Sequence, residues 1–360
     1  MATRIWNFNP GPATLPLPVL ERMKADLPNY AGTGMAVMEL SHRSKEYAAI
    51  HADAKSLLRE LFIIPENHHI LFLQGGASLQ FAMVPMNLLG EEKSADYINT
   101  GSWSKKAVKE AKLFGKVNIA GSSEESKFTF IPKDFTFDKN AQYVHITSNN
   151  TIAGTQWATY PNTGNVPLVA DMSSDIMCRK IDVSKFGIIY AGAQKNLGPS
   201  GVTVVIIRDD VTAKCREDLT TMMKYKTHIE NDSLFNTPPT YSIYILKLVL
   251  EHVKNCGGLS AVEKENTDKA KLLYSTIDSN KDFFRCPVKE DSRSIMNVVF
   301  RLPSEDLEAK FIADAKAAGF SGLKGHRSVG GIRVSMYNAM PLKGIQDLTK
   351  FMQDFAQKNG

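Results

Sequence analysis

The sequence predicts an α/β fold, in which a mostly parallel sheet lies between helices and a smaller α+β domain follows. Short apolar runs of strand length, such as H-I-L-F-L from His69 and G-I-I-Y-A from Gly187, alternate with amphipathic segments of helical length. These runs are apolar at nearly every position, which is typical of parallel strands buried on both faces. After Cys256 the rhythm changes to long helices separated by fewer strands. Alternation of this kind favours a layered α/β domain.

The predicted elements follow the chain from its first helix to its last. The helices are Pro16–Asn29, Glu46–Phe62, Leu79–Leu88, one beginning at Trp103, Asp209–Leu219, Tyr241–Lys254, Leu259–Ser279, Glu305–Ala318 and Leu342–Lys358. The strands are His69–Leu73, Asp96–Asn99, Val117–Ala120, Gln142–Ile146, Pro167–Ala170, Ile188–Ala191, Val202–Arg208, Ile295–Leu302 and Ile332–Met336. The last helix carries an apolar stripe at helical spacing, which predicts a core-facing side and nothing more.

Glycine and proline mark the predicted domain boundaries. Residues 1–15 are rich in Pro, Gly and Asn and favour an arm without regular structure. The N-C-G-G segment ending at Gly258 precedes the change of rhythm. We therefore expect an arm at 1–15, a large domain at 16–256 and a small C-terminal domain at 257–360.

Composition excludes several classes of protein. Of 360 residues, 43% are hydrophobic and 22% charged, and the net charge of +5 is dispersed, which argues against a nucleic-acid partner. No apolar run approaches membrane-spanning length, and the start of the chain lacks a signal-peptide pattern. The four cysteines are far apart, which argues against a metal site or a disulfide framework. We expect a soluble, cytoplasmic protein.

Two ionisable residues end neighbouring predicted strands in the middle of the chain. Asp171 follows Pro167–Ala170, and Lys195 follows Ile188–Ala191 in the glycine-rich segment A-G-A-Q-K-N-L-G-P-S-G. A lysine can form a Schiff base with the aldehyde of pyridoxal phosphate (PLP), and a carboxylate can keep its pyridine nitrogen protonated. Ser173 and Gln194 would supply further polar contacts. The pair predicts a PLP site.

A strand, a glycine-rich turn and a helix follow one another from His69. The turn Gly75-Gly76-Ala77-Ser78 would point backbone N–H groups and the positive end of a helix dipole at an anion. Beside a PLP lysine, Ala77 and Ser78 are the expected donors to the cofactor phosphate.

Two groups of cations suggest a substrate with two anionic ends. His326, Arg327 and Arg333 lie within eight residues, and His42-Arg43 follows a glycine-broken loop. Arginine binds carboxylates and phosphates through its planar fork, so both groups are candidate anion sites.

Several motifs, in order, resemble those of the phosphoserine aminotransferase family in the fold-type I group of PLP enzymes. They are N-F-N-P-G-P-A, S-H-R-S, F-L-Q-G-G-A-S-L-Q-F, A-G-A-Q-K-N-L-G-P-S-G, F-N-T-P-P-T and G-H-R-S-V-G-G-I-R. The resemblance covers essentially the whole chain. It implies a seven-stranded-type sheet in the PLP-binding domain and an N-terminal arm that lies across the active site.

The resemblance also implies roles for individual residues. Trp103 would stack on the pyridine ring and Thr151 would contact the cofactor, whereas Asn236 and Thr237 would reach the cofactor phosphate of a partner subunit in a homodimer. Arg333 would bind the α-carboxylate. The substrate phosphate, or the side-chain carboxylate of glutamate, would be bound by His42, Arg43, His326 and Arg327, with Arg43 and the His326-Arg327 pair coming from the neighbouring subunit. Some relatives carry arginine at the position of Ser78, so that cation is absent here or comes from elsewhere.

The implied reaction is transamination between L-glutamate and 3-phosphohydroxypyruvate, giving 2-oxoglutarate and O-phospho-L-serine. Three alternatives stay open at this point. A cysteine desulfurase-like lyase would need a reactive cysteine near the cofactor. An alanine–glyoxylate-type transaminase would not need the second cation group. A catalytically silent PLP-fold protein would bind metabolites or a partner without turnover.

Overall fold

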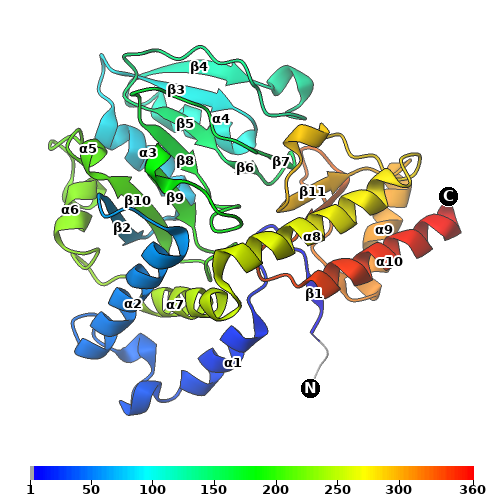
Figure 1. The fold of residues 1–360 in the computed structure, drawn as a ribbon, viewed down its shortest axis with the longest axis horizontal. Coiled ribbons are helices and arrows are strands. Elements are labelled where there is room, and N and C mark those ends of the chain that lie inside the picture. Colours follow the sequence, from blue (N-terminus) through cyan, green and yellow to red (C-terminus); the bar gives the residue numbers. More distant parts are fainter. Residues whose placement is uncertain (1–3) are drawn as a thin grey trace.

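The computed structural model describes residues 4–360 and is built around one seven-stranded sheet (Figure 1). In spatial order its strands are β2 (His68–Leu73), β10 (Thr203–Arg208), β9 (Phe186–Gly192), β8 (Leu168–Asp171), β5 (Val144–Thr147), β3 (Ser94–Asn99) and β4 (Lys116–Ser122). The five strands from β9 to β4 are mutually parallel, and only β10 runs antiparallel to both of its neighbours. The predicted mostly parallel sheet is confirmed.

Helices cover both faces of this sheet because its strands are apolar on both sides. Within β2, Leu71 and Leu73 belong to the core beneath α3 (Gly76–Leu88) and α4 (Ser102–Ala111). Ile70 and Phe72 belong to the opposite core, which α2 (Lys45–Phe62) and α7 (Thr240–Asn255) cover. Successive side chains of a strand point to opposite faces, so a continuous apolar run fills both cores.

The C-terminal part has a separate apolar core. The strand pair β11 (Asn297–Phe300) and β13 (Ile332–Ser335) packs with α8 (Gly258–Asp278), α9 (Glu305–Ala317) and α10 (Leu342–Asn359). Figure 1 shows α8 running from the large sheet toward this core, with α10 alongside it. The division into domains at residue 256 stays a prediction.

The described part of the N-terminal arm packs against this C-terminal core. Strand β1 (Trp6–Asn7) pairs in parallel with β12 (Phe320–Ser321), and Phe8 is fully buried among the C-terminal residues. Helix α1 (Leu17–Asp26) follows the arm. The other α-helices and strands are short: α5 (Asp209–Thr212), α6 (Tyr225–Glu230), β6 (Asn149–Asn150) and β7 (Thr155–Gln156). None of the helices within residues 4–360 is long and apolar enough to span a membrane.

One predicted helix is wrong and one begins earlier than expected. Instead of a helix over Asp209–Leu219, α5 ends at Thr212, because Arg216 makes tertiary contacts instead of helical ones. Its backbone N–H donates to Asn87 O (2.8 Å), and its guanidinium pairs with Asp218, two residues away. Residues two apart do not face each other on a helix. Helix α3 begins at Gly76 rather than Leu79, which brings Ala77 and Ser78 into its first turn.

Candidate active site

A cavity of about 640 Å³ lies at the carboxyl ends of the central parallel strands. This is where ligands bind in open α/β sheets, because the loops that leave the strands diverge there. Among its lining residues are eight of the ten predicted cofactor contacts: Ala77, Ser78, Trp103, Thr151, Asp171, Ser173, Gln194 and Lys195.

Asp171 and Lys195 reach the cavity from adjacent strands, as predicted. Asp171 is the last residue of β8 and pairs with Tyr190 of β9, and Lys195 follows the end of β9 by three residues. The Ser173 backbone N–H donates to Asp171 Oδ1 (2.9 Å). Ser173 Oγ in turn accepts from the Gly192 N–H (3.1 Å). These bonds fix the carboxylate relative to both strand ends.

Burial raises the pKa of Asp171, and the hydrogen bonds from Ser173 and the charge of Lys195 oppose this shift. A buried carboxylate is costly unless it is paired. A cationic group inside the cavity, next to Asp171, would therefore be strongly stabilised.

The side chain of Lys195 lies among groups suited to hold a flat ligand. Lys195 Nζ donates to Thr151 Oγ1 (3.3 Å) and lies 5.9 Å from the centroid of the Trp103 ring. The Gln194 carbonyl accepts from Ala13 N (2.9 Å), which ties the N-terminal arm to the lysine segment. The N-terminal arm also passes close to the lysine: a Cβ atom added at Gly11 would lie 3.4 Å from Lys195 Cγ.

The first turn of α3 lines one part of the cavity. Gly75 has φ +82°, and a Cβ there would lie 2.6 Å from Leu79 Cβ, so the turn requires glycine. Ala77 and Ser78 line the cavity in this first turn, where backbone N–H groups have no partner within the helix. Such groups favour an anion.

The donor set of this cavity fits PLP. It offers an amine for the aldehyde, a buried carboxylate for the pyridine nitrogen, and a helix N-terminus for the phosphate. Trp103 adds an aromatic face beside Lys195, and its indole Nε1 is buried without a hydrogen-bond partner.

Arg333 and His326 also line this cavity. Arg333 is only 7% exposed, and burial lowers the pKa of its guanidinium. Its Nε is buried without a hydrogen-bond partner. Burial, together with the charges of Arg333, Arg327 and Lys106, lowers the pKa of His326. A substrate carboxylate would supply the partner that Arg333 lacks.

Four of the five predicted site residues that do not line the cavity form a separate cluster, which we call the His42 cluster. Its members are His42, Arg43, Asn236 and Thr237. Thr237 Oγ1 lies 3.2 Å from His42 Nδ1, Arg43 Nε lies 3.4 Å from His42 Nε2, and Asn236 Nδ2 donates to Thr237 O. None of the four lines the cavity of its own chain.

His326 and Arg327, which the resemblance assigns together to a neighbouring subunit, differ in their positions relative to the cavity of their own chain. His326 lines the cavity of its own chain. Arg327 is exposed and does not line that cavity.

Sequence reasoning missed several lining residues. Asn149 Nδ2 donates to Ser174 Oγ (2.8 Å) and Asn297 Oδ1 (2.7 Å) and so joins the cavity wall to β11. Lys106 does not line the cavity, but its Nζ lies 4.3 Å from the centroid of the Trp103 ring, which does. In the sequence, only the pairs Asn149-Asn150 and Lys105-Lys106 mark these two residues, and neither pair is specific for a ligand site.

Comparison with known proteins agrees with this site. The model of the class-V aminotransferases matches residues 5–348. Fold and site therefore define a class-V aminotransferase, which uses PLP. A phosphoserine aminotransferase of Lysinibacillus sphaericus is 55% identical, and one of Geobacillus kaustophilus is 56% identical; the alignments cover at least 99% of both chains. The chain belongs to the phosphoserine aminotransferase family.

Solved structures agree over the whole length. The phosphoserine aminotransferase of Bacillus circulans subsp. alkalophilus superposes with a TM-score of 0.98 at 51% identity, covering 99% of both chains. The PLP-bound enzyme of Trichomonas vaginalis gives 0.92 at 38% identity, covering 97% of this chain and all of the other.

Proposed function

We propose that this chain catalyses PLP-dependent transamination of 3-phosphohydroxypyruvate with L-glutamate, giving O-phospho-L-serine and 2-oxoglutarate for L-serine synthesis. The single observation that carries a carboxylate-bearing substrate is Arg333. Its guanidinium is nearly buried in the cavity that Lys195 lines, and its Nε is without a partner. An arginine placed in this way favours a bidentate carboxylate.

The proposed roles follow from these positions. When bound, PLP supplies an aldehyde for the amino group and an electron-withdrawing ring. Asp171 would keep the ring nitrogen protonated, since its carboxylate is buried and oriented by Ser173. Arg333 holds the α-carboxylate so that the α-carbon faces Lys195. The Lys195 amine would take up the α-proton as a general base, and the resulting ammonium would deliver that proton to the cofactor as a general acid.

The phosphate end of the substrate needs a second group of cations. His326 lies in the same cavity as Arg333. The His42 cluster lies outside this cavity, so we propose that a homodimer places the cluster of each subunit at the site of its partner. Asn236 and Thr237 would then reach the cofactor phosphate, and His42 and Arg43 the substrate phosphate.

The cysteine positions argue against the lyase alternative. Cys178 and Cys215 are buried, and none of the four cysteines lines the cavity that contains Asp171. The exposed Cys256 lines the neighbouring cavity, which Lys195 also borders. All four cysteines are free thiols, which supports our proposal of a cytoplasmic, reducing location.

The deciding experiment is a visible-spectrum titration of the purified, PLP-loaded protein. O-phospho-L-serine should abolish the absorbance of the lysine-bound cofactor, 2-oxoglutarate should restore it, and L-alanine should have no effect. An equal response to L-alanine would instead favour an alanine–glyoxylate-type enzyme. Absence of any cofactor band after PLP is added would favour a silent binding protein.

A further inference from the structure

Lys269 of α8 is a fully buried lysine, with 0% exposure, outside the active-site cavity. Its Nζ donates to three backbone carbonyls: Met340 O (2.9 Å), Tyr337 O (3.0 Å) and Met336 O (3.2 Å). Within residues 4–360, no carboxylate forms an ion pair with it. An ammonium group has three N–H donors, so each of them has one acceptor here.

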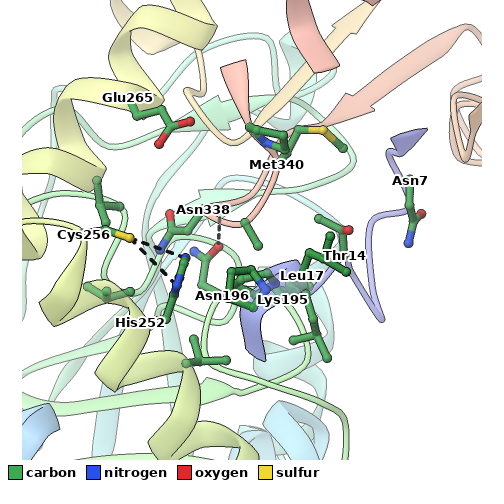
Figure 2. A pocket seen from close by; sticks show the side chains of 18 of the residues that line it. Asn7, Thr14, Leu17, Lys195, Asn196, His252, Cys256, Glu265, Asn338 and Met340 are labelled. Carbon is green, nitrogen blue, oxygen red and sulfur yellow. Dashed lines mark hydrogen bonds between the residues drawn. The ribbon is translucent and has the colours of Figure 1, made fainter. Parts of the chain in front are cut away.

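The segment held by Lys269, residues 336–340, touches two parts of the active site. Tyr337 Oη donates to Pro10 O (2.8 Å), and Pro10 lines the PLP cavity. Asn338 N donates to Asn196 Oδ1 (3.1 Å), immediately after Lys195. Figure 2 shows this contact, with Lys195 beside Asn196 at the edge of a second cavity of about 460 Å³.

A second side chain of α8 holds the same segment. Asn266, one turn before Lys269, donates from Nδ2 to Asn338 Oδ1 and to Cys178 O, both at 2.9 Å. The segment also follows directly after β13, which carries Arg333. Through residues 336–340, Lys269 and Asn266 thus connect α8 both to β13, which carries Arg333, and to the loop that carries Lys195.

Stability alone is a poor reason for a lysine at this position. A buried charge without an opposite charge is costly, and an apolar side chain of similar length would pack without that cost. Burial lowers the pKa of Lys269 to about 8, so near neutral pH the ammonium keeps all three donors. Unlike an apolar residue, the ammonium group fixes the backbone conformation of residues 336–340 through its three hydrogen bonds.

We propose that Lys269 is a positioning residue for the transamination: by binding the carbonyls of residues 336–340, it holds Asn338 against Asn196 and so places Lys195 for proton transfer. This inference rests on the proposed function. Positioning errors of about 1 Å can cost on the order of 10²-fold in rate.

The test compares Lys269→Met with Lys271→Met, an exposed lysine on the same helix. Backbone hydrogen exchange of residues 336–340 should accelerate at least tenfold in Lys269→Met and stay unchanged in the control. Turnover per bound PLP should fall at least tenfold through kcat, with a smaller change in KM. Lys269→Gln, whose side-chain amide keeps one donor group, should have an exchange rate and a kcat between those of Lys269→Met and Lys271→Met.

A double-mutant cycle with Asn196→Ala tests the path. If Lys269 acts through the Asn338–Asn196 contact, the kcat losses of Lys269→Met and Asn196→Ala should not multiply. Unchanged turnover per bound PLP, with only a lower unfolding midpoint, would overturn the proposal, and so would fully multiplicative losses. If Lys269→Met gives no soluble protein, the cycle with Lys269→Gln decides. Hydrogen exchange does not depend on turnover. A failure of the Lys269 proposal can therefore be distinguished from a failure of the proposed function, in which the spectrum of the wild-type, PLP-loaded chain would not respond to O-phospho-L-serine.

Discussion

Thr237 Oγ1 lies 3.2 Å from His42 Nδ1, although 195 positions separate the two residues in the sequence. Both belong to the His42 cluster, which does not line the cavity that contains Lys195. Two parts of one predicted site are therefore each assembled within the chain but are not joined to each other. A second copy of the chain is the simplest way to join them, because C₂ dimers place equivalent patches opposite one another.

This arrangement predicts complementation between two inactive variants. Arg43→Met should disable the partner's site and Lys195→Ala its own, so each homodimer should be inactive. Co-expression should restore about a quarter of the wild-type activity, because half of the dimers are mixed and each of these has one intact site. Steady-state transamination of the co-purified, differently tagged mixture measures this. Complete inactivity of isolated mixed dimers would place Arg43 at the site of its own chain.

Replacing Lys195 by alanine should abolish turnover but leave the fold intact. The proposed general base is lost, so kcat should fall at least about 10³-fold, whereas the Ser173–Asp171 contact does not involve the lysine side chain. Initial rates with O-phospho-L-serine and circular dichroism check both parts. Lys185→Ala, an exposed lysine on the preceding turn, is the matched control. Appreciable turnover by Lys195→Ala would refute the assignment.

Replacing Arg333 by glutamine should weaken substrate binding more than cofactor binding. A charge-assisted hydrogen bond contributes about 1.5–3 kcal/mol, so kcat/KM should fall about 10- to 150-fold. PLP content should stay at the wild-type level, because Arg333 is not among the groups assigned to the cofactor. Arg22→Gln, an exposed arginine that pairs with Asp26, serves as the control. An equal loss of PLP would mean that Arg333 supports the cofactor pocket instead.

The buried His145 predicts a pH dependence of stability. It stacks on Tyr97 and lies 2.8 Å from Tyr190 Oη, and burial lowers its pKa to about 3. The unfolded chain protonates this histidine below about pH 6.5 while the folded chain does not, so its contribution to stability decreases as the pH falls through that window. From pH 7 to pH 5 the loss from this residue should be about 2 kcal/mol.

Urea unfolding at the two pH values checks this effect. His145→Gln should reduce the pH-dependent loss by about that amount. The same loss in His145→Gln as in the wild type would show that other groups dominate the acid sensitivity.

Local sequence predicted most of the helices and strands because their apolar spacing agrees with their tertiary environment. It failed at Asp209–Leu219, where charge content suggested a helix but the contact of Arg216 with Asn87 at the end of α3 decided otherwise. It also placed the start of α3 three residues late. A glycine pair reads as a turn in sequence, whereas the second glycine already takes part in the helix.

By itself, the sequence determined the α/β class and the presence of two cation groups, and it predicted PLP chemistry for Asp171 and Lys195, because strand periodicity and glycine-rich strand ends are local properties. Only the tertiary structure decided which residues share a cavity. It brought His326 and Arg333 to Lys195, left the His42 cluster outside, and buried Lys269 against three carbonyls. These relationships depend on how α8, β13 and the loops pack across long sequence separations, which no local pattern encodes.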